Sequence, residues 1–411
     1  MTEKVILVGV GKPGENTEAS LLELQELLKT ADAESVGTVI QNREAIHPGT
    51  YIGKGKIEEV KDLIRETEAT GIVCDDELTP AQMSNLSELL DTKVMDRTVV
   101  ILDIFASHAR TSEGKIQVEL AQHRYQLTRL SGYGRDMSRL GGGIGTRGPG
   151  ETKLETDRRR IRQRITTLKQ ELRELQKQRE LRRVKREKNH IPVAAIVGYT
   201  NAGKSTLLNA LTGANVLSED KLFATLDPTT RSFILPLGEN ILLTDTVGFI
   251  RKLPHHLIDA FRSTLEEAKY ADFLIHVVDS ADPDYEDHMA VVYETLRELQ
   301  ISGKPILTLF NKCDLAESTQ IFRDSRADRT LRVSAKTGEG LSEVAECIQD
   351  FLRESRIYFE HCYDFKDAGK IQLVRKYGQL ISEEYTAQGI LVKAWIPKIV
   401  IQYVNGKEGE Q

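Results

Sequence analysis

The chain has 411 residues, 40% hydrophobic and 29% charged, so it is long enough for about two to four domains and apolar enough to bury their cores. This composition excludes a wholly disordered protein, and no run approaches the roughly 18 apolar residues of a membrane-spanning helix. The N-terminal MTEKVILVGVGK has no signal-peptide pattern, and the four cysteines lack the paired spacing of zinc or redox sites. We therefore expect a cytoplasmic protein with reduced thiols. Its net charge of −6 is unevenly distributed along the sequence.

Residues 1–112 predict a parallel α/β domain. Apolar strands alternate with helical patterns, an order typical of a parallel sheet covered by helices. The predicted strands are KVILVGV, SVGTVI, GIVCDD and KVMDR, and the predicted helices are LLELQELLKTA, GKIEEVKDLIRETEA and PAQMSNLSELLD. Between them, HPGTYIGKGK (47–56) is glycine-rich and basic, so phosphate contact is one interpretation. A strand-to-helix turn is favoured, because the full phosphate-loop pattern is missing.

Residues 113–190 predict an antiparallel helical hairpin. The first helix carries a packing seam at spacings of four and three: Ile116, Leu120, His123, Leu127 and Leu130. The glycine-rich SGYGRDMSRLGGGIGTRGPGET follows and is predicted to form the tip. The second helix carries the same kind of seam: Leu154, Ile161, Ile165, Leu168, Leu172 and Leu175. Beyond it, QKQRELRRVKREKNH is interpreted as a solvated linker.

Positive charge is concentrated in this hairpin. Residues 131–190 contain 18 Lys or Arg against 8 Asp or Glu, a net charge of +10, so the rest of the chain carries −16. Such a surface can neutralise RNA phosphates, and Arg135, Arg139 and Arg147 with Tyr133 are candidates for phosphate pairing or base stacking. The alternative is a disordered glycine-rich loop on a solvated coiled coil, since charge runs are common on exposed helices.

Residues 191–355 resume an α/β pattern and contain a phosphate-binding loop. PVAAIVGYTNAGKSTLLNAL has G-x-x-x-x-G-K-S from Gly198 to Ser205, after an apolar strand and before an amphipathic helix. Glycines let backbone N–H groups face the β-phosphate, and the helix N-terminus adds partial positive charge. Lys204 is expected to bridge the β- and γ-phosphates, and Ser205 to offer its hydroxyl to Mg²⁺.

A second motif predicts which base is recognised. NKCD follows the strand PILTLF, and its Asp314 can accept hydrogen bonds from the ring N–H and the exocyclic amine of guanine. Adenine lacks this donor pair, so the carboxylate would be left unpaired against ATP. Asn311 and the stem of Lys312 are expected to line the base and ribose, and SAK (334–336) to offer a backbone contact to the guanine oxygen. In this order behind a phosphate-binding loop, the motif favours guanine recognition over an ordinary β-turn.

Two segments between these motifs are predicted to respond to the γ-phosphate. FATLDPTTR (223–231), the predicted first switch, offers three threonines, of which we choose Thr225 over Thr229 and Thr230 as the Mg²⁺ ligand. DTVGF (245–249), the predicted second switch, supplies an Asp to hold a metal-bound water and a Gly whose N–H senses the γ-phosphate. Loss of that phosphate is expected to relax both switches.

The motifs together predict a site for GTP or GDP with Mg²⁺. The predicted catalytic residues are Lys204, Thr225 and Gly248, and the predicted metal ligands are Ser205 and Thr225. The predicted nucleotide-binding residues are Gly198, Tyr199, Thr200, Asn201, Ala202, Gly203, Lys204, Ser205, Phe223, Ala224, Thr225, Leu226, Asp227, Asp245, Thr246, Val247, Gly248, Asn311, Lys312, Cys313, Asp314, Ser334, Ala335 and Lys336.

The last part of the chain, residues 356–411, predicts a small α+β domain. IYFEHCYDF, GILVKAWIP and KIVIQYV are interpreted as strands, and AGKIQLVRKYGQLISEEYTA as one helix. The predicted architecture is therefore α/β: an N-terminal parallel α/β domain with an antiparallel helical hairpin, a P-loop GTPase domain, and this small domain.

The motifs GYTNAGKST, FATLD, DTVGF, NKCD and SAK resemble the translation-factor-like GTPases related to Obg. With an α/β domain and GGGIGTRGPGETKLETDRRRI before them, nearly the whole chain is similar to the HflX family. The resemblance implies a GTPase that binds the large ribosomal subunit through the hairpin and separates or rescues stalled or idle ribosomes, for instance under stress. For some members an ATP-related activity of the N-terminal domain has been proposed.

The second switch raises a question about hydrolysis. Many GTPases have a water-orienting Gln where this chain has Phe249, which neither donates nor accepts a hydrogen bond. The resemblance implies a hydrophobic residue here. Either a ribosomal partner orders the switches, or K⁺ held at Asn201 supplies positive charge; a simple loop hydrogen bond is the alternative role for Asn201. We therefore expect slow intrinsic hydrolysis and marked stimulation by ribosomal particles.

Two other functions remain open at this point. The protein could be an assembly factor for the large subunit, or a membrane-associated signalling GTPase. The basic helix permits peripheral membrane association but lacks the aromatic apolar face of an interfacial anchor. We expect a cytoplasmic, ribosome-associated monomer that does not bind DNA.

Overall fold

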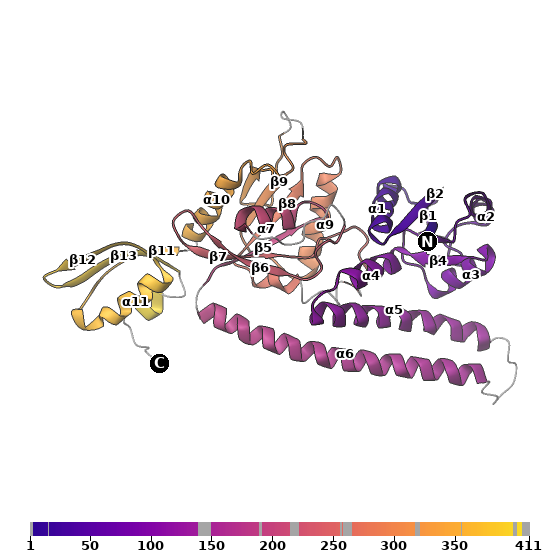
Figure 1. Ribbon diagram of the computed structural model, residues 1–411, viewed down its shortest axis with the longest axis horizontal. Helices are drawn as coiled ribbons and strands as arrows, with labels where there is room; N and C mark the ends of the chain where they lie inside the picture. The colour runs from indigo at the N-terminus through magenta and orange to yellow at the C-terminus, as the bar shows by residue number, and fades with distance from the viewer. Residues whose placement is uncertain are drawn as a thin grey trace.

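The computed structural model describes residues 3–14, 16–138, 149–188, 191–213, 222–254, 257, 265–316, 321–354, 356–397 and 401–404. An N-terminal sheet and a central sheet lie next to each other, and the hairpin of α5 and α6 runs along them (Figure 1). A third, smaller sheet lies at the opposite end of the molecule from the first (Figure 1). This arrangement confirms the predicted fold class.

The N-terminal domain is a four-stranded parallel sheet in the order β2-β1-β3-β4. Its elements are β1 (Glu3–Gly11), α1 (Thr17–Thr30), β2 (Ala33–Asn42), α2 (Lys54–Thr67), β3 (Gly71–Cys74), α3 (Pro80–Leu90), β4 (Lys93–Asp96) and α4 (Arg97–His108). The sequence patterns predicted a strand ending at Arg97 and did not predict the helix α4 that follows. This helix begins because Asp96 caps it, accepting a hydrogen bond from the backbone N–H of Val99 at 3.1 Å.

The hairpin consists of α5 (Ser112–Ser138) and α6 (Pro149–Lys188). Leu120, Ile165 and Leu168 are buried at the predicted seam. Arg158 donates to the carbonyl of Leu130 at 3.1 Å and Arg164 pairs with Glu119 at 2.7 Å, so the two helices run antiparallel.

The second helix of the hairpin is longer than the sequence pattern predicts. The predicted linker beyond Leu175 is wrong, because α6 continues to Lys188; Arg, Lys, Glu and Gln are all good helix formers. The predicted tip residues Arg139 and Arg147 lie outside the described residues, as do the side chains of Tyr133 and Arg135.

The central domain has a six-stranded sheet in the order β10-β9-β8-β5-β7-β6, parallel except for β6. Its elements are β5 (Val193–Gly198), α7 (Lys204–Thr212), β6 (Thr229–Ile234), β7 (Asn240–Asp245), β8 (Phe273–Asp279), α9 (Tyr285–Glu298), β9 (Ile306–Asn311), β10 (Arg329–Arg332) and α10 (Leu341–Glu354). The phosphate loop, the second switch and NKCD each start at the carboxyl end of a parallel strand. These ends share one edge of the sheet, which is where open α/β sheets bind ligands.

The C-terminal domain is an antiparallel sheet in the order β11-β13-β12. Its elements are β11 (Arg356–Tyr363), the short helix η1 (Phe365–Asp367), α11 (Ala368–Tyr377), β12 (Gln379–Thr386), β13 (Gly389–Pro397) and α12 (Ile401–Val404). The single helix predicted over 368–387 is wrong, because Gln379–Thr386 pairs with β13 as a strand. The strand predicted over 398–404 is also wrong where it is described, since Ile401–Val404 is helical.

One apolar cluster joins the first two domains. It contains Leu24 of α1, Phe105 of α4, Phe223 and Leu226 of the first switch and Phe249 of the second switch, all at most 3% exposed. Both switches therefore pack against the N-terminal half of the chain. No helix in the described part of the chain is long and apolar enough to cross a bilayer, and all four cysteines are free thiols.

Candidate functional site

The phosphate-binding loop forms a small cradle between β5 and α7. Gly203 has a φ of +93°, and a side chain there would collide with the Asn311 amide, so the position requires glycine. The cradle encloses a cavity of about 50 Å³, which is lined by ten predicted residues together with Thr206: Thr200, Asn201, Gly203, Lys204, Ser205, Phe223, Ala224, Thr225, Thr246 and Gly248. The patterns missed Thr206, although it directly follows the motif.

Lys204 is the buried cation of this cradle. Its ammonium donates a hydrogen bond to the backbone carbonyl of Tyr199 at 2.7 Å, which holds the side chain back along the loop. Burial lowers the pKa of Lys204 to about 8, and the nearby carboxylate of Asp245 only partly opposes this. A desolvated ammonium interacts strongly with any phosphate placed beside it.

Three oxygen-bearing side chains meet at the floor of the cradle. The Ser205 hydroxyl lies 2.8 Å from that of Thr225 and donates to Asp245 at 2.6 Å. Burial raises the pKa of Asp245, and one of its carboxylate oxygens has no hydrogen-bond partner among the described residues. An orphaned carboxylate oxygen beside two hydroxyls fits Mg²⁺, which prefers oxygen ligands.

Thr225 is the threonine of the first switch that faces this cluster. Thr230 lies on β6, where its hydroxyl is 2.9 Å from that of Thr244, and neither Thr229 nor Thr230 lines the cradle. No group of three or more His, Cys, Asp or Glu in the described residues could hold a metal ion. A Mg²⁺ site here would therefore depend on hydroxyls and nucleotide phosphates as well as on Asp245.

Gly248 closes the cradle from the second switch. A methyl group added there would lie 2.8 Å from Cγ2 of Thr200 and 2.9 Å from the Lys204 ammonium. The backbones of the second switch and the phosphate loop can therefore come this close because residue 248 has no side chain. We expect Gly248→Ala to lower GTP turnover by about 10²-fold, the effect of misplacing one transition-state donor. GDP binding should change far less, because GDP has no γ-phosphate for this N–H to reach.

Single-turnover hydrolysis and GDP titration would measure both effects. Gly55→Ala on α2 is the matched control, because its added methyl meets nothing within 4 Å. Equal losses of GTP turnover and GDP affinity in Gly248→Ala would argue against γ-phosphate sensing by this position.

The two predicted base-binding loops are held together by Asn311. Its amide donates to the carbonyl of Ala202 at 2.9 Å, and its side-chain oxygen accepts from the backbone N–H of Ala335 at 2.9 Å. From a buried position Asn311 therefore connects NKCD both to the phosphate loop and to SAK. Lys312 pairs with Asp279 at 2.7 Å. Asp314 is exposed at the rim.

The remaining SAK and NKCD positions divide between interior and rim. Ser334 and Ala335 are buried, whereas Lys336 is exposed. The backbone N–H of Cys313 donates to the carbonyl of Val333 at 3.2 Å, which joins the end of NKCD to the strand before SAK. A ligand at this rim would meet Asp314 and Lys336 first.

Several residues predicted to bind the nucleotide point elsewhere. Leu226 and Val247 are buried in the apolar cluster between the domains. The Asp227 carboxylate accepts hydrogen bonds from the chain just before α5. None of these three side chains lines the cradle.

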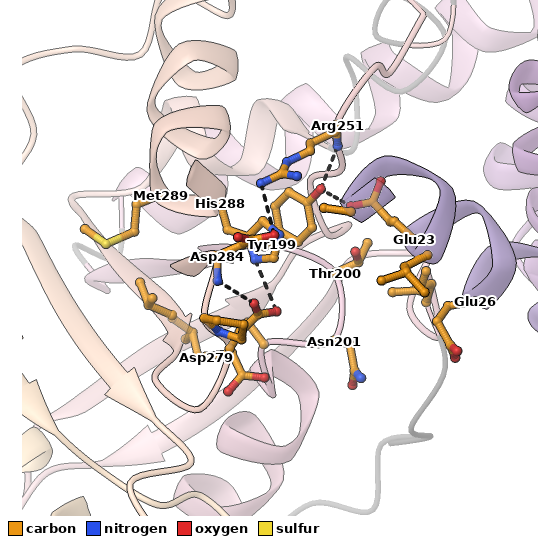
Figure 2. Close-up of a pocket in the computed structure, with 18 of the residues that line it drawn as sticks. Glu23, Glu26, Tyr199, Thr200, Asn201, Arg251, Asp279, Asp284, His288 and Met289 are labelled. Atoms are coloured by element: carbon orange, nitrogen blue, oxygen red, sulfur yellow. Dashed lines mark hydrogen bonds and ion pairs between the residues drawn. The ribbon is translucent and has the colours of Figure 1, made fainter. Parts of the chain in front are cut away.

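Tyr199 also points away from the cradle, toward the N-terminal domain (Figure 2). Its ring stacks on His288 with centroids 3.9 Å apart, and its hydroxyl accepts from the backbone N–H of Arg251 at 2.8 Å and donates to Glu23 of α1. These groups border a cavity of about 360 Å³ between α1, the phosphate loop and the start of α9. Burial raises the pKa of Tyr199 to about 12, so its hydroxyl stays protonated as the donor to Glu23.

Phe249 has a packing role. Its backbone pairs with the phosphate loop, with Thr200 N–H donating to its carbonyl at 2.8 Å and its own N–H donating to the Gly198 carbonyl at 3.1 Å. The side chain is 1% exposed within the apolar cluster and does not line the cradle. Its burial stabilises the fold by roughly 1.5–3 kcal/mol. Phe249 thus joins the second switch to the interdomain core.

The chain is similar to known proteins along nearly its whole length. Three family models match it: a GTP-binding GTPase N-terminal region over residues 18–106, a GTP-binding GTPase middle region over 108–186, and a 50S ribosome-binding GTPase over 193–312. The GTPase HflX of Lacrimispora saccharolytica is 64% identical over 396 residues, which cover 96% of this chain and 94% of that protein. The chain belongs to the HflX family of GTPases. It binds and hydrolyses GTP.

The chain is also similar to a relative from another organism and to a solved structure. The GTPase HflX of Escherichia coli is 42% identical over 354 residues, covering 85% of this chain and 83% of that protein. Among solved structures, a GTP-binding protein from the archaeon Sulfolobus solfataricus in complex with GDP is 27% identical, covers 84% of this chain and 98% of its own, and has a TM-score of 0.43.

In this HflX-family chain the loop 47–56 is built by its own contacts. Nδ1 of His47 bonds the backbone N–H groups of Gly49 at 3.3 Å and Thr50 at 3.1 Å. Tyr51 is fully buried with a φ of +64°, and its hydroxyl donates to Asp76 at 2.7 Å. This internal bonding favours a structural turn over a phosphate-binding loop.

The patterns missed the polar residues that join the N-terminal domain to the second switch of this HflX-family GTPase. Lys252 pairs with the buried Asp75 and, at 2.9 Å, with Asp76. Burial alone would lower the pKa of Lys252, but these two carboxylates raise it. A single hint was present: Asp96 and Arg97 are charged residues between the apolar segments VM and VVIL, as buried ion-pair partners would be.

Proposed function

We propose that this GTPase binds the large ribosomal subunit through the hairpin, residues 113–190, and uses GTP hydrolysis to separate or rescue stalled or idle ribosomes. One observation carries the proposal: α6 presents exposed cations that pair with no carboxylate in the described part of the chain, namely Arg159, Arg160, Arg162, Lys169 and Arg173. Unpaired cations on a long helix suit an RNA backbone. The 50S ribosome-binding description of the matching family supports the same partner.

The cradle suggests how hydrolysis proceeds. Water attacks the γ-phosphorus, the bond to the β–γ bridging oxygen breaks, and GDP and phosphate are formed. We assign Lys204 to neutralise charge on the β- and γ-phosphates, and the Gly248 N–H to donate to a γ-phosphate oxygen. Ser205 and Thr225 would hold Mg²⁺ directly and Asp245 through water; the ion supplies positive charge across the two phosphates when bound.

The group that orients water is proposed to depend on the ribosome. Phe249 is buried away from the cradle, so it cannot be that group. Ordering of the switches by the bound subunit would replace the water-orienting side chain that this chain lacks at position 249. Asn201 lines the cradle with a φ of +59° and is the candidate K⁺ ligand, with a loop hydrogen bond as its alternative role. We further propose that the protein works as a monomer on cytoplasmic ribosomes and not on DNA.

GTP turnover in a salt series tests the proposal. We expect large ribosomal subunits to stimulate turnover strongly at low salt and less as salt rises, because phosphate contacts release counterions. The triple variant Arg159→Gln/Arg160→Gln/Arg162→Gln should bind subunits more weakly, and its slope of log affinity against log salt should be shallower by about 2. Running the series in both K⁺ and Na⁺ separates an ion effect from a partner effect.

The matched control removes three exposed arginines elsewhere: Arg65→Gln/Arg297→Gln/Arg353→Gln. This control should keep the wild-type salt dependence. Turnover that is the same with and without subunits at every salt concentration would refute ribosomal activation. Stimulation by precursor particles but not by mature subunits would indicate an assembly factor, and stimulation by anionic vesicles would indicate a membrane partner.

A further inference from the structure

The first switch has two faces. Ala224 and Thr225 line the cradle, whereas Leu226 is 2% exposed in the cluster shared with the N-terminal half. Phe223 borders the cradle and also packs edge-on against Phe105 of α4, with ring centroids 4.7 Å apart. A movement of Thr225 would therefore act directly on the junction of α4 and α5.

Asp227 connects this switch to the start of the hairpin. Its carboxylate accepts hydrogen bonds from the backbone N–H groups of Arg110 and Thr111, each at 2.9 Å, and from the Thr111 hydroxyl. Thr111 is the N-cap of α5: its hydroxyl accepts from Gly114 N–H at 3.0 Å and its carbonyl from Lys115 N–H at 3.0 Å. The switch thus extends the cap of the hairpin's first helix.

The packing around this contact leaves little freedom. A Cβ added at Gly114 would collide with the Asp227 carboxylate, so glycine allows the close approach. The negative charge also lies at the positive end of a 27-residue helix. The cap itself, Thr111, directly precedes the helix, but the carboxylate that binds this cap comes from another domain and stands two residues after Thr225.

We propose that Asp227 is a positioning residue for GTP hydrolysis, linking Thr225 to the ribosome-binding hairpin through the cap of α5. The ribosomal part of this inference rests on the proposed function. Binding of the hairpin then orients the first switch, which offsets the missing water-orienting side chain at position 249. In return, loss of the γ-phosphate frees the switch and loosens the start of α5.

Hydrogen exchange tests the link without ribosomes. In the full-length wild type, the amides of residues 111–115 should exchange about tenfold more slowly with a non-hydrolysable GTP analogue than with GDP. In Asp227→Asn and Thr111→Ala this difference should disappear, because each removes part of the shared contact. Thr111→Ser keeps the hydroxyl and is the matched control that should retain it.

Two exchange results would overturn the proposal: a wild-type difference that persists in Asp227→Asn, or no difference between nucleotides in the wild type. Amides of β1 and β3, which lie away from this contact, report whether a variant has lost its fold. The double variant Thr111→Ala/Asp227→Asn should behave like either single variant, since both act through one contact. Additive effects would contradict a shared link.

Turnover with large subunits tests the functional consequence. With large subunits, Asp227→Asn should lose turnover relative to the wild type by a factor at least tenfold greater than the loss without subunits. Its co-sedimentation with subunits should be retained. Loss of binding in this variant would show that Asp227 only supports the hairpin's structure. If the wild type itself neither binds subunits nor is stimulated by them, the proposed function fails, and the exchange result still decides whether the switch and α5 are linked.

Discussion

Asp314→Asn is expected to weaken GTP binding by about 10²–10³-fold, corresponding to two hydrogen bonds to a charged group. The carboxylate offers two acceptors, which match the ring N–H and exocyclic amine of guanine. Asn replaces one acceptor with a donor, which then faces the guanine amine. Because Asp314 is exposed at the rim and makes no hydrogen bond within the described residues, the substitution should leave the fold intact.

The same variant should bind xanthosine triphosphate better than the wild type does. Xanthine carries an oxygen where guanine carries the amine, so the Asn amide can donate to it while its carbonyl accepts the ring N–H. Competition binding with both triphosphates would measure the change of preference from GTP to xanthosine triphosphate. Asp350→Asn on α10 makes the same chemical change on the surface and should preserve GTP binding. Equal GTP affinity in Asp314→Asn and wild type would remove Asp314 from base recognition.

Arg97→Leu is expected to destabilise the N-terminal domain by about 3–5 kcal/mol, as removal of one partner from a buried ion pair does. The guanidinium is 1% exposed and pairs with Asp75 at 2.8 Å and with Glu23. Burial lowers the pKa of Arg97 to about 10, which still keeps it charged near neutral pH. Leucine would leave Asp75 buried with Lys252 as its only cationic partner among the described residues.

Hydrogen exchange of the β1 and β3 amides measures this opening free energy for one domain of a multidomain chain. Arg65→Leu on α2 is the matched control, because that side chain is 77% exposed. It should change stability by at most about 0.5 kcal/mol. A comparable loss in both variants would mean that the buried ion pair is not the cause. We also expect Arg97→Leu to loosen the contact between Glu23 and Tyr199, since Arg97 holds the same carboxylate.

Local patterns were sufficient where one short segment carries all the required information. The phosphate loop is such a case: the spacing of its glycines and lysine within eight residues defines the turn, and the structure places ten predicted residues around one cradle. The hairpin is another, because the heptad-like seam specifies which faces of two consecutive helices meet. The family resemblance came from the order of such segments along the chain.

Partners distant in sequence decided the rest. Residues Gln379–Thr386 have a helical sequence pattern but form a strand, because they pair with β13 in an antiparallel sheet. Asp227 and Tyr199 lie within nucleotide-binding motifs, yet their side chains bond to Thr111 and Glu23, which are 116 and 176 residues away. The sequence showed that Phe249 replaces the usual Gln, but only the fold showed that its side chain packs in a core between two domains. The sequence alone thus determined the nucleotide loop, the hairpin and the family. Only the tertiary structure decided which switch residues line the cradle and which pack against the N-terminal half, because that choice depends on packing between segments brought together by folding.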